Sequence, residues 1–193
     1  LQETWRLGTD DFHIDDYHIF FQGNSTKTNT KGRVMGGVCI ILSPTFDLAH
    51  KKSGKETITI PANEGENFEG RFIGIPLTFP NTDDNGKNIK GELNITLCSI
   101  YHPVDNEEYE SFNSTLSSIL NHIPQKSNII LGHDINANTG TNANNGQNFK
   151  DTIGPFGIEN RNKKGTSLLN LLASLNLKLT NSYFNPRPSN RTA

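Results

Sequence analysis

The stretch that most constrains this chain covers residues 128–140 and reads NIILGHDINANTG. It opens with an apolar run, Ile129, Ile130 and Leu131, which ends at Gly132. A short apolar run bounded by turn residues is typical of a strand that is buried on both faces of a sheet. We therefore expect such a strand here, and the rest of the chain must supply its neighbours.

Polar side chains follow this run at once, namely Asp134, Asn136 and Asn138. Asp134 and Asn136 are two positions apart, so they project to the same side if the extended chain continues. A carboxylate and an amide at the end of a buried strand could hold a water molecule and a phosphate oxygen. Asp and Asn also form Asx turns, and spacing alone favours that simpler interpretation.

Length and charge bound the class of protein. A chain of 193 residues without a visible linker predicts one domain over residues 1–193. A net charge of −2 gives no evidence of nucleic-acid binding, although a local basic patch stays open. Cys39 and Cys98 lie in apolar runs without CxxC spacing, so we expect buried free thiols of a reducing compartment.

Targeting signals are not visible in the sequence. No apolar run approaches the ~18 residues of a membrane span, and no signal peptide is seen, so the chain is expected to be intracellular and to make no membrane contact. The chain opens with Leu1 rather than Met, which indicates a fragment.

The order of expected elements favours an α/β protein. A helix should begin at Asp105, where Glu108 completes a capping-box pattern, and a second one near 165–166. The expected helical faces are Tyr109, Phe112, Leu116, Ile119, Leu120 and Ile123, then Leu168, Leu169, Leu172 and Leu175. Strands are expected at 19–23, 36–42, 57–60, 71–77, 93–101, 129–131 and 177–180. Early strands followed by alternating strands and helices predict sheets with helices outside.

Several common active-site motifs are absent from the sequence. It has no Gly-rich phosphate loop, no zinc-type Cys/His spacing and no G-x-S-x-G elbow.

Four segments in order carry a resemblance: LQET, IYHP, GHDINA and the run from GPFGIENRNKKG to NSYF. Together they resemble the endonuclease/exonuclease/phosphatase superfamily, and most closely the apurinic-like endonuclease domain of non-LTR retrotransposons. The resemblance covers most of the chain. It implies a four-layer α/β sandwich, in which two mixed sheets pack face to face with helices outside, here truncated at both ends.

The resemblance assigns roles to four positions. Glu3 of LQET matches a metal-binding glutamate, and Tyr101 of IYHP matches a tyrosine that supports the scissile phosphate. Asp134 matches the aspartate that orients the attacking water, with a share in metal binding, and Asn136 matches an asparagine that contacts the phosphate. The implied cofactor is Mg²⁺, with Mn²⁺ as a substitute. Mg²⁺ prefers oxygen ligands and keeps several waters, so one or two carboxylates suffice.

Departures from the family pattern limit the expected activity. Ile135 stands where Phe is usual, and His133 stands where Gly is commoner; alternation points His133 away from Asp134, which favours a structural or surface role. The family's first strand would precede Leu1, and its Ser-Asp-His segment, with the catalytic histidine, would follow Ala193. None of the chain's six histidines takes that place. Loss of a general acid/base group costs ~10²–10⁴ in rate, so little or no activity is expected.

Basic and amide side chains in the last third are candidates for contact with a DNA backbone. The candidates are Arg161, Asn162 and Lys163, followed by Lys164, Arg187 and Arg191. Most Lys and Arg side chains are simply solvated, and that interpretation stays open.

The sequence thus predicts a Mg²⁺-dependent phosphodiesterase, namely the DNA-nicking endonuclease of a retroelement. A reverse transcriptase domain is expected in the same polyprotein, with action in the nucleus. The alternatives are a non-catalytic remnant of the fold and a phospholipid or phosphoinositide phosphodiesterase, although no lipid-facing apolar loop is found. Target site, abasic-site specificity and oligomeric state stay open.

Overall fold

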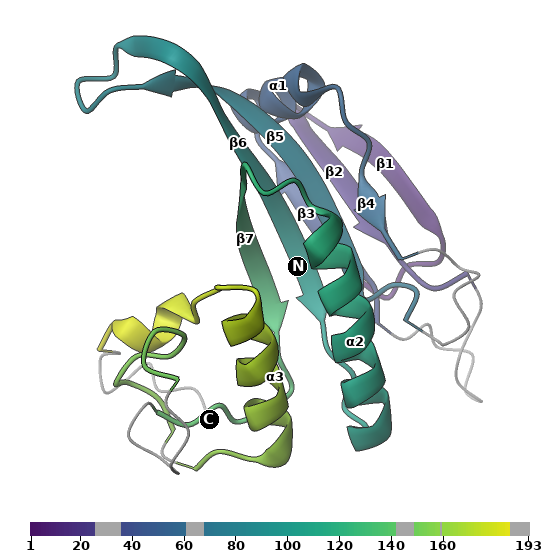
Figure 1. Cartoon of the computed structure of the whole chain (residues 1–193). Coiled ribbons are helices and arrows are strands. Elements are labelled where there is room, and N and C mark those ends of the chain that lie inside the picture. Colours follow the sequence, from purple (N-terminus) through teal and green to yellow (C-terminus); the bar gives the residue numbers. More distant parts are fainter. Residues whose placement is uncertain (26–35, 61–67, 142–148, 159, 186–193) are drawn as a thin grey trace. The chain divides into compact units, whose positions relative to one another are not determined.

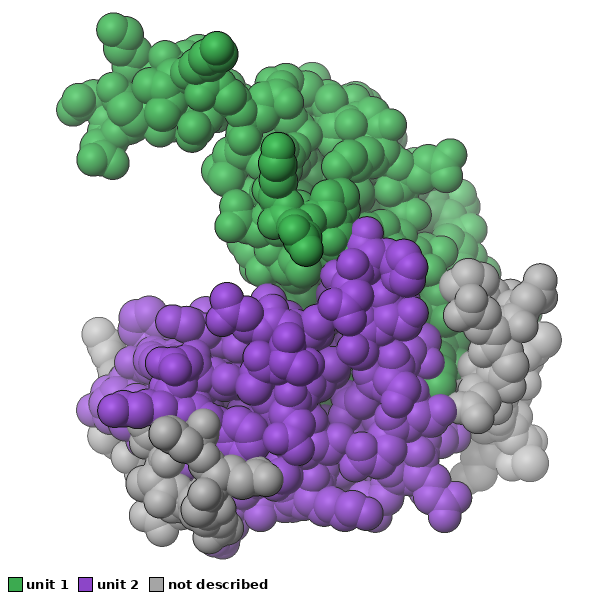
Figure 2. Space-filling model, viewed as in Figure 1, with its two compact units in different colours: residues 1–102, 123–135 green, residues 103–122, 136–193 purple. Residues whose placement is uncertain are grey.

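The computed structural model describes residues 1–25, 36–60, 68–141, 149–158 and 160–185. The chain divides into two compact units (Figure 2). Leu1–His102 with Ile123–Ile135 form the first, called the sheet unit here, and Pro103–His122 with Asn136–Ala193 form the second, called the helical unit. That the two make one domain stays a prediction.

The sheet unit holds two sheets (Figure 1). The first has the order β1-β2-β3 and consists of β1 (Thr9–Ile14), β2 (Tyr17–Gln22) and β3 (Val38–Leu42). The second has the order β4-β5-β6-β7 and consists of β4 (Ile58–Thr59), β5 (Phe72–Thr82), β6 (Asn88–Tyr101) and β7 (Ser127–Asp134). Two sheets with helices confirm the predicted α/β class.

Strand directions refine that prediction. All described pairs in the first sheet are antiparallel, whereas the second sheet is mixed because β6 and β7 run parallel. The first sheet, among the described residues, is therefore not the mixed sheet that was expected.

The core of the sheet unit is shared by both sheets. Its buried residues are Phe20, Val38, Leu42, Ala49, Ile73, Ile75 and Leu77. Ile95, Leu97 and Tyr101 of β6 pack against this cluster, so the face of β6 that carries them contributes to the core. Burial of such apolar surface is the dominant favourable term in folding, so these contacts hold the two sheets together.

Strand β7 differs from its prediction. Its residues alternate between half-buried and exposed, and Ile130 is 52% exposed. The expectation of burial on both faces is wrong. The physical reason lies in the topology, because β7 ends the strand order and pairs only with β6 among the described strands.

Helix α1 (Pro44–Ser53) lies in a segment for which the sequence predicted no element. Proline suits the first helical turn, where its missing N–H is not needed. Asp47 in the first turn and Lys51 in the last complement the helix dipole, and Gly54 ends the helix with a φ of 60°. Burial raises the pKa of Asp47, but hydrogen bonds from Lys51 and His18 outweigh it and lower that pKa overall.

In the helical unit, α2 (Asn106–His122) begins where the capping residue predicted. The Asp105 carboxylate accepts hydrogen bonds from the backbone N–H groups of Glu107 at 2.8 Å and Glu108 at 3.3 Å. These bonds satisfy two N–H groups that have no partner within the helix. The predicted buried face is confirmed, with Tyr109, Phe112, Leu116 and Leu120 inside.

Helix α3 (Lys163–Ser174) begins slightly earlier than expected, and Leu168, Leu169 and Leu172 are buried as predicted. The Asn113 side-chain amide of α2 donates to the Ser167 hydroxyl of α3 at 2.8 Å. The strand predicted at 177–180 is wrong. Leu179 forms only an isolated bridge with Ile153, and the 3-10 helix η1 (Thr180–Tyr183) follows at once.

Among the described residues, we find no helix with the length and apolar character that crossing a membrane requires.

The two cysteines yield a testable prediction. Both are free and buried, as predicted, and burial raises the pKa of Cys98 to about 12 and also raises that of Cys39. Because the thiolate is the reacting form, Cys98 of the folded protein should react at pH 8 roughly 10³-fold more slowly than an unperturbed thiol. Both thiols should react quickly in guanidinium chloride. Timed labelling with a chromogenic disulfide measures this, and rapid labelling of the folded protein would contradict it.

Candidate active site

The candidate site lies where β6 and β7 end. The parallel pairing places Tyr101, the last residue of β6, beside Asp134, the last residue of β7. The backbone N–H of His102 then donates to the Asp134 carbonyl at 3.0 Å. Since parallel strands present their carboxyl ends at the same edge of a sheet, this register fixes the two side chains as neighbours.

Glu3 reaches the same edge from the N-terminal segment. The Tyr101 hydroxyl donates to Glu3 Oε1 at 2.9 Å, although the two residues are 98 positions apart. Just before it, the Gln2 side-chain amide donates to the Ser99 hydroxyl at 3.3 Å and to the Gly132 carbonyl at 3.2 Å. The segment is thereby attached to both β6 and β7.

The backbone of this segment is held against the residues that precede β3. The N–H of Thr4 donates to the Gly37 carbonyl at 3.1 Å, and the N–H of Trp5 donates to the Gly36 carbonyl at 3.0 Å. Glu3 itself has a φ of 56°, a left-handed conformation that side chains other than glycine rarely adopt. Such conformations persist only where the surroundings hold them, and here the flanking hydrogen bonds do so.

Electrostatics keep Tyr101 protonated. Burial, its hydrogen bond to Glu3 and the negative charges of Glu3 and Asp134 raise the pKa of this phenol. The Arg71 guanidinium, 5.3 Å above the ring centroid, opposes the shift but does not cancel it. Tyr101 is therefore a hydrogen-bond donor at neutral pH.

Sequence reasoning missed Arg71 and the contact of His102 with His133. His102 Nδ1 and His133 Nε2 share a hydrogen bond, and His102 is fully buried. Burial and the nearby His102 lower the pKa of His133 well below its usual value. His133 is half-buried whereas Asp134 is exposed, in agreement with the structural role expected from alternation. The register of β6 and β7 brings these two histidines together, and the sequence alone does not reveal that register.

The donor set of this edge fits a hard cation. Glu3 and Asp134 offer carboxylate oxygens, and both residues are exposed. Two carboxylates are fewer than a dedicated all-protein cage needs, but Mg²⁺ is commonly bound by one or two carboxylates with waters and substrate phosphate.

Asn136 does not continue the strand. β7 ends at Asp134, and Asn136 has a φ of 43°, so the extended chain that same-side projection required stops before it. Asn136 falls in the helical unit. Its contact with phosphate stays a prediction.

Asn162 caps helix α3. Its side-chain oxygen accepts hydrogen bonds from the N–H of Gly165 at 2.8 Å and from the N–H of Asn138 at 3.3 Å. It thereby satisfies one exposed N–H of the first turn and ties the helix to the segment after β7. The sequence signal was available, since Asn is a preferred N-cap residue.

The other candidates for DNA contact differ in the contacts that they make within the protein. The Arg161 guanidinium donates to the carbonyls of Thr139 at 2.7 Å and Thr141 at 2.8 Å, and it lies 5.1 Å from the centroid of the Phe149 ring. Lys163 is exposed, and the Lys164 ammonium donates to the Val104 carbonyl at 2.9 Å. Arg187 and Arg191 lie outside the described residues.

The fold of this chain resembles that of a solved structure. No family model and no curated protein match this chain. A solved structure described as the endonuclease domain of TRAS1, a telomere-specific non-LTR retrotransposon, aligns with 83% of the chain at 16% identity and a TM-score of 0.40. The match covers 52% of that structure's chain, so this chain spans about half its length. At this identity and TM-score the likeness carries no functional argument.

Substitution of Gly37 tests how tightly the N-terminal segment is held. Gly37 has a φ of 91°, and an added Cβ would lie 2.3 Å from Thr4 Oγ1. Gly37→Ala should lower the free energy of unfolding by the backbone strain plus ~1–3 kcal/mol of overpacking. Gly86→Ala is the matched control, because Gly86 has a φ of 77° but its added Cβ meets no described atom within 4 Å. Equal urea-unfolding midpoints for the two variants would contradict the packing argument.

Substitution of Asn162 tests its structural role. Asn162→Ala removes the cap of α3 and should cost ~1 kcal/mol of unfolding free energy. Asn170→Ala is the control, since Asn170 is exposed within the same helix. Thermal unfolding followed by circular dichroism compares them. A loss no greater for Asn162→Ala than for Asn170→Ala would refute the capping role.

Proposed function

We propose that this chain is a metal-dependent phosphodiesterase domain, namely the DNA-nicking endonuclease of a non-LTR retroelement. One observation carries the proposal: Tyr101 donates to Glu3 directly beside Asp134. These are three residues that the motif resemblance assigns to one site. They come from the N-terminal segment and two parallel strands, and the fold gathers them at one sheet edge.

In this proposal, Glu3 and Asp134 hold Mg²⁺, or Mn²⁺ in its place. When bound, such an ion supplies positive charge that neutralises charge developing on the phosphate. Asp134 accepts a proton from the attacking water, a role that needs a carboxylate within hydrogen-bonding reach. Tyr101 stays protonated, so its hydroxyl can exchange the hydrogen bond to Glu3 for one to a phosphate oxygen when substrate binds. Contact of Asn136 with a phosphate is a further part of this proposal, and it rests on the motif resemblance alone.

The polymer substrate and the partners follow from the proposed role. The exposed Lys163 would bind backbone phosphates of the DNA. Arg161 and Asn162 would contribute those N–H groups that are not used in hydrogen bonds within the protein. A reverse transcriptase domain would belong to the same polyprotein, and the nick would prime it in the nucleus.

A second candidate is a non-catalytic remnant that keeps the fold and binds DNA without turnover. It is favoured by the hydrogen bonds of the histidines. His102 and His133 bond to each other, His18 to two carboxylates, His50 to the Pro76 carbonyl and His122 to the Ser118 carbonyl. These bonds give the imidazoles structural partners, and loss of a general acid/base costs ~10²–10⁴ in rate.

Plasmid nicking tests the proposal. Nicking of supercoiled DNA in Mg²⁺, which is expected to be slow, should fall by ~10²-fold or more in Asp134→Ala, because the group that accepts the water proton is gone. Tyr101→Phe removes one donor and should cost less than Asp134→Ala. Asp84→Asn, an exposed acid in the turn between β5 and β6, should nick like the original chain.

A binding measurement separates the two candidates. Fluorescence anisotropy with labelled DNA and Ca²⁺ reports binding without requiring turnover. Binding without any nicking would favour the remnant. A folded chain that neither binds nor nicks DNA would contradict both the endonuclease and the remnant.

A further inference from the structure

A second group of ligand-type side chains lies elsewhere in the sheet unit. His13, His18 and Asp47 each offer one ligand atom, and these atoms all lie within 4.8 Å of one another. His13 of β1 and His18 of β2 are cross-strand partners whose ring centroids are 4.0 Å apart. Asp47 comes from α1, so three elements converge on this place.

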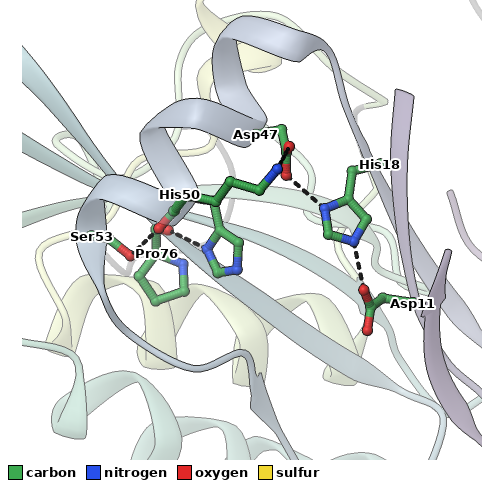
Figure 3. A network of polar contacts seen from close by, with 7 residues as sticks. Asp11, His18, Asp47, His50, Ser53 and Pro76 are labelled. Atoms are coloured by element: carbon green, nitrogen blue, oxygen red, sulfur yellow. Dashed lines mark hydrogen bonds and ion pairs between the residues drawn. The ribbon is translucent and has the colours of Figure 1, made fainter. Parts of the chain in front are cut away.

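His18 is the centre of the group, and Figure 3 shows its contacts. Its Nδ1 lies 2.6 Å from Asp47 Oδ1, and its Nε2 lies 2.6 Å from Asp11 Oδ2. A neutral imidazole has one N–H and can donate to only one carboxylate. One of these two contacts therefore requires a further cation, which is either an extra proton or a metal ion.

The chemistry of the donors selects the kind of ion. Imidazole nitrogen together with carboxylate suits Zn²⁺ and its neighbours in the transition series, whereas Mg²⁺ and Ca²⁺ prefer oxygen alone. Three protein ligands with an open fourth position make a familiar zinc arrangement.

We propose that His13, His18 and Asp47 form a binding site for Zn²⁺ or a similar transition-metal ion. The ion takes the place of the proton between His18 Nδ1 and Asp47. Asp11 then accepts the hydrogen bond from Nε2–H, which fixes the tautomer of His18, as carboxylates commonly do for metal-bound histidines.

The site needs only small adjustments to bind an ion. Zn–N and Zn–O distances of ~2.0–2.2 Å in a tetrahedron require the Nδ1 and Oδ1 atoms to separate from 2.6 Å to about 3.4 Å. The His13 ring must rotate out of its stack, because stacked imidazoles direct their lone pairs side by side. His13 is exposed and can do so. His18 and Asp47 are buried and already oriented, which lowers the ordering cost.

One neighbour opposes the ion. The Lys51 ammonium lies 2.6 Å from Asp47 Oδ2, so it competes for the same carboxylate. The alternative occupant of the site is therefore a proton, in an ion-pair network of Asp11, His18, Asp47 and Lys51. The two alternatives differ in a measurable way, since only the first depends on His13.

Metal titration of the full chain tests the proposal. Zn²⁺ binding is measured by calorimetry, and Co²⁺ serves as a spectroscopic probe whose visible absorption reports tetrahedral nitrogen and oxygen ligands. We expect one Zn²⁺ per chain and a Kd at least tenfold weaker in His13→Gln. His13 is the first choice because it is exposed, so its loss should leave the fold intact, which thermal unfolding checks.

Two control variants make the test specific. His50→Gln should bind as the original chain does, since His50 of α1 donates from Nδ1 to the Pro76 carbonyl and is not in the group. Glu3→Gln should also bind normally, which separates this site from the proposed hydrolytic one. Absence of binding, or equal affinity of His13→Gln, would overturn the proposal, as would loss of binding in Glu3→Gln.

Discussion

The parallel pairing of β6 with β7 is the constraint on which the candidate site depends. It sets Tyr101 opposite Asp134, and it continues into the bond from His102 to the Asp134 carbonyl. A slip of one residue would send Tyr101 and Asp134 to opposite faces, because side chains alternate along a strand. The apolar face of β6, packed into the core between the sheets, opposes that slip. Core packing thus fixes the positions of polar groups that contribute little to stability themselves.

The third member of the site is held in a different way. Glu3 lies on a segment without regular structure, and its orientation rests on backbone bonds to Gly36 and Gly37 and on the Gln2 amide. Gly37 has no side chain where Thr4 passes, so the close approach depends on that glycine. Tyr101 links the N-terminal segment to the core, since it packs against the core and donates to Glu3.

Local signals in the sequence predicted local structure well, and failed where distant residues decide. The Asp105 cap and the apolar spacing after it gave the start and the buried face of α2, because both act within a few residues. The burial of β7 depends on how many strands flank it, and the apolar run of 129–131 does not carry that information. The motifs proposed Glu3, Tyr101 and Asp134, but not Arg71 or the partner of His133, since those contacts arise from strand register. Asn136 shows a local failure, because alternation was extended past the end of the strand.

The two groups of titratable residues in the sheet unit differ in a way that follows from their surroundings. Glu3 and Asp134 are exposed oxygen donors at strand ends, where water and a phosphate can complete the shell of a hard ion. His18 and Asp47 are buried between a strand and a helix, and the ring nitrogens there are already oriented by carboxylates. Because a neutral imidazole can donate only one hydrogen bond, its contacts with two carboxylates require either a second proton or a metal ion. The two sites therefore favour different cations. Carboxylate oxygens favour Mg²⁺ at the first site, and imidazole nitrogen with carboxylate favours Zn²⁺ or a similar ion at the second.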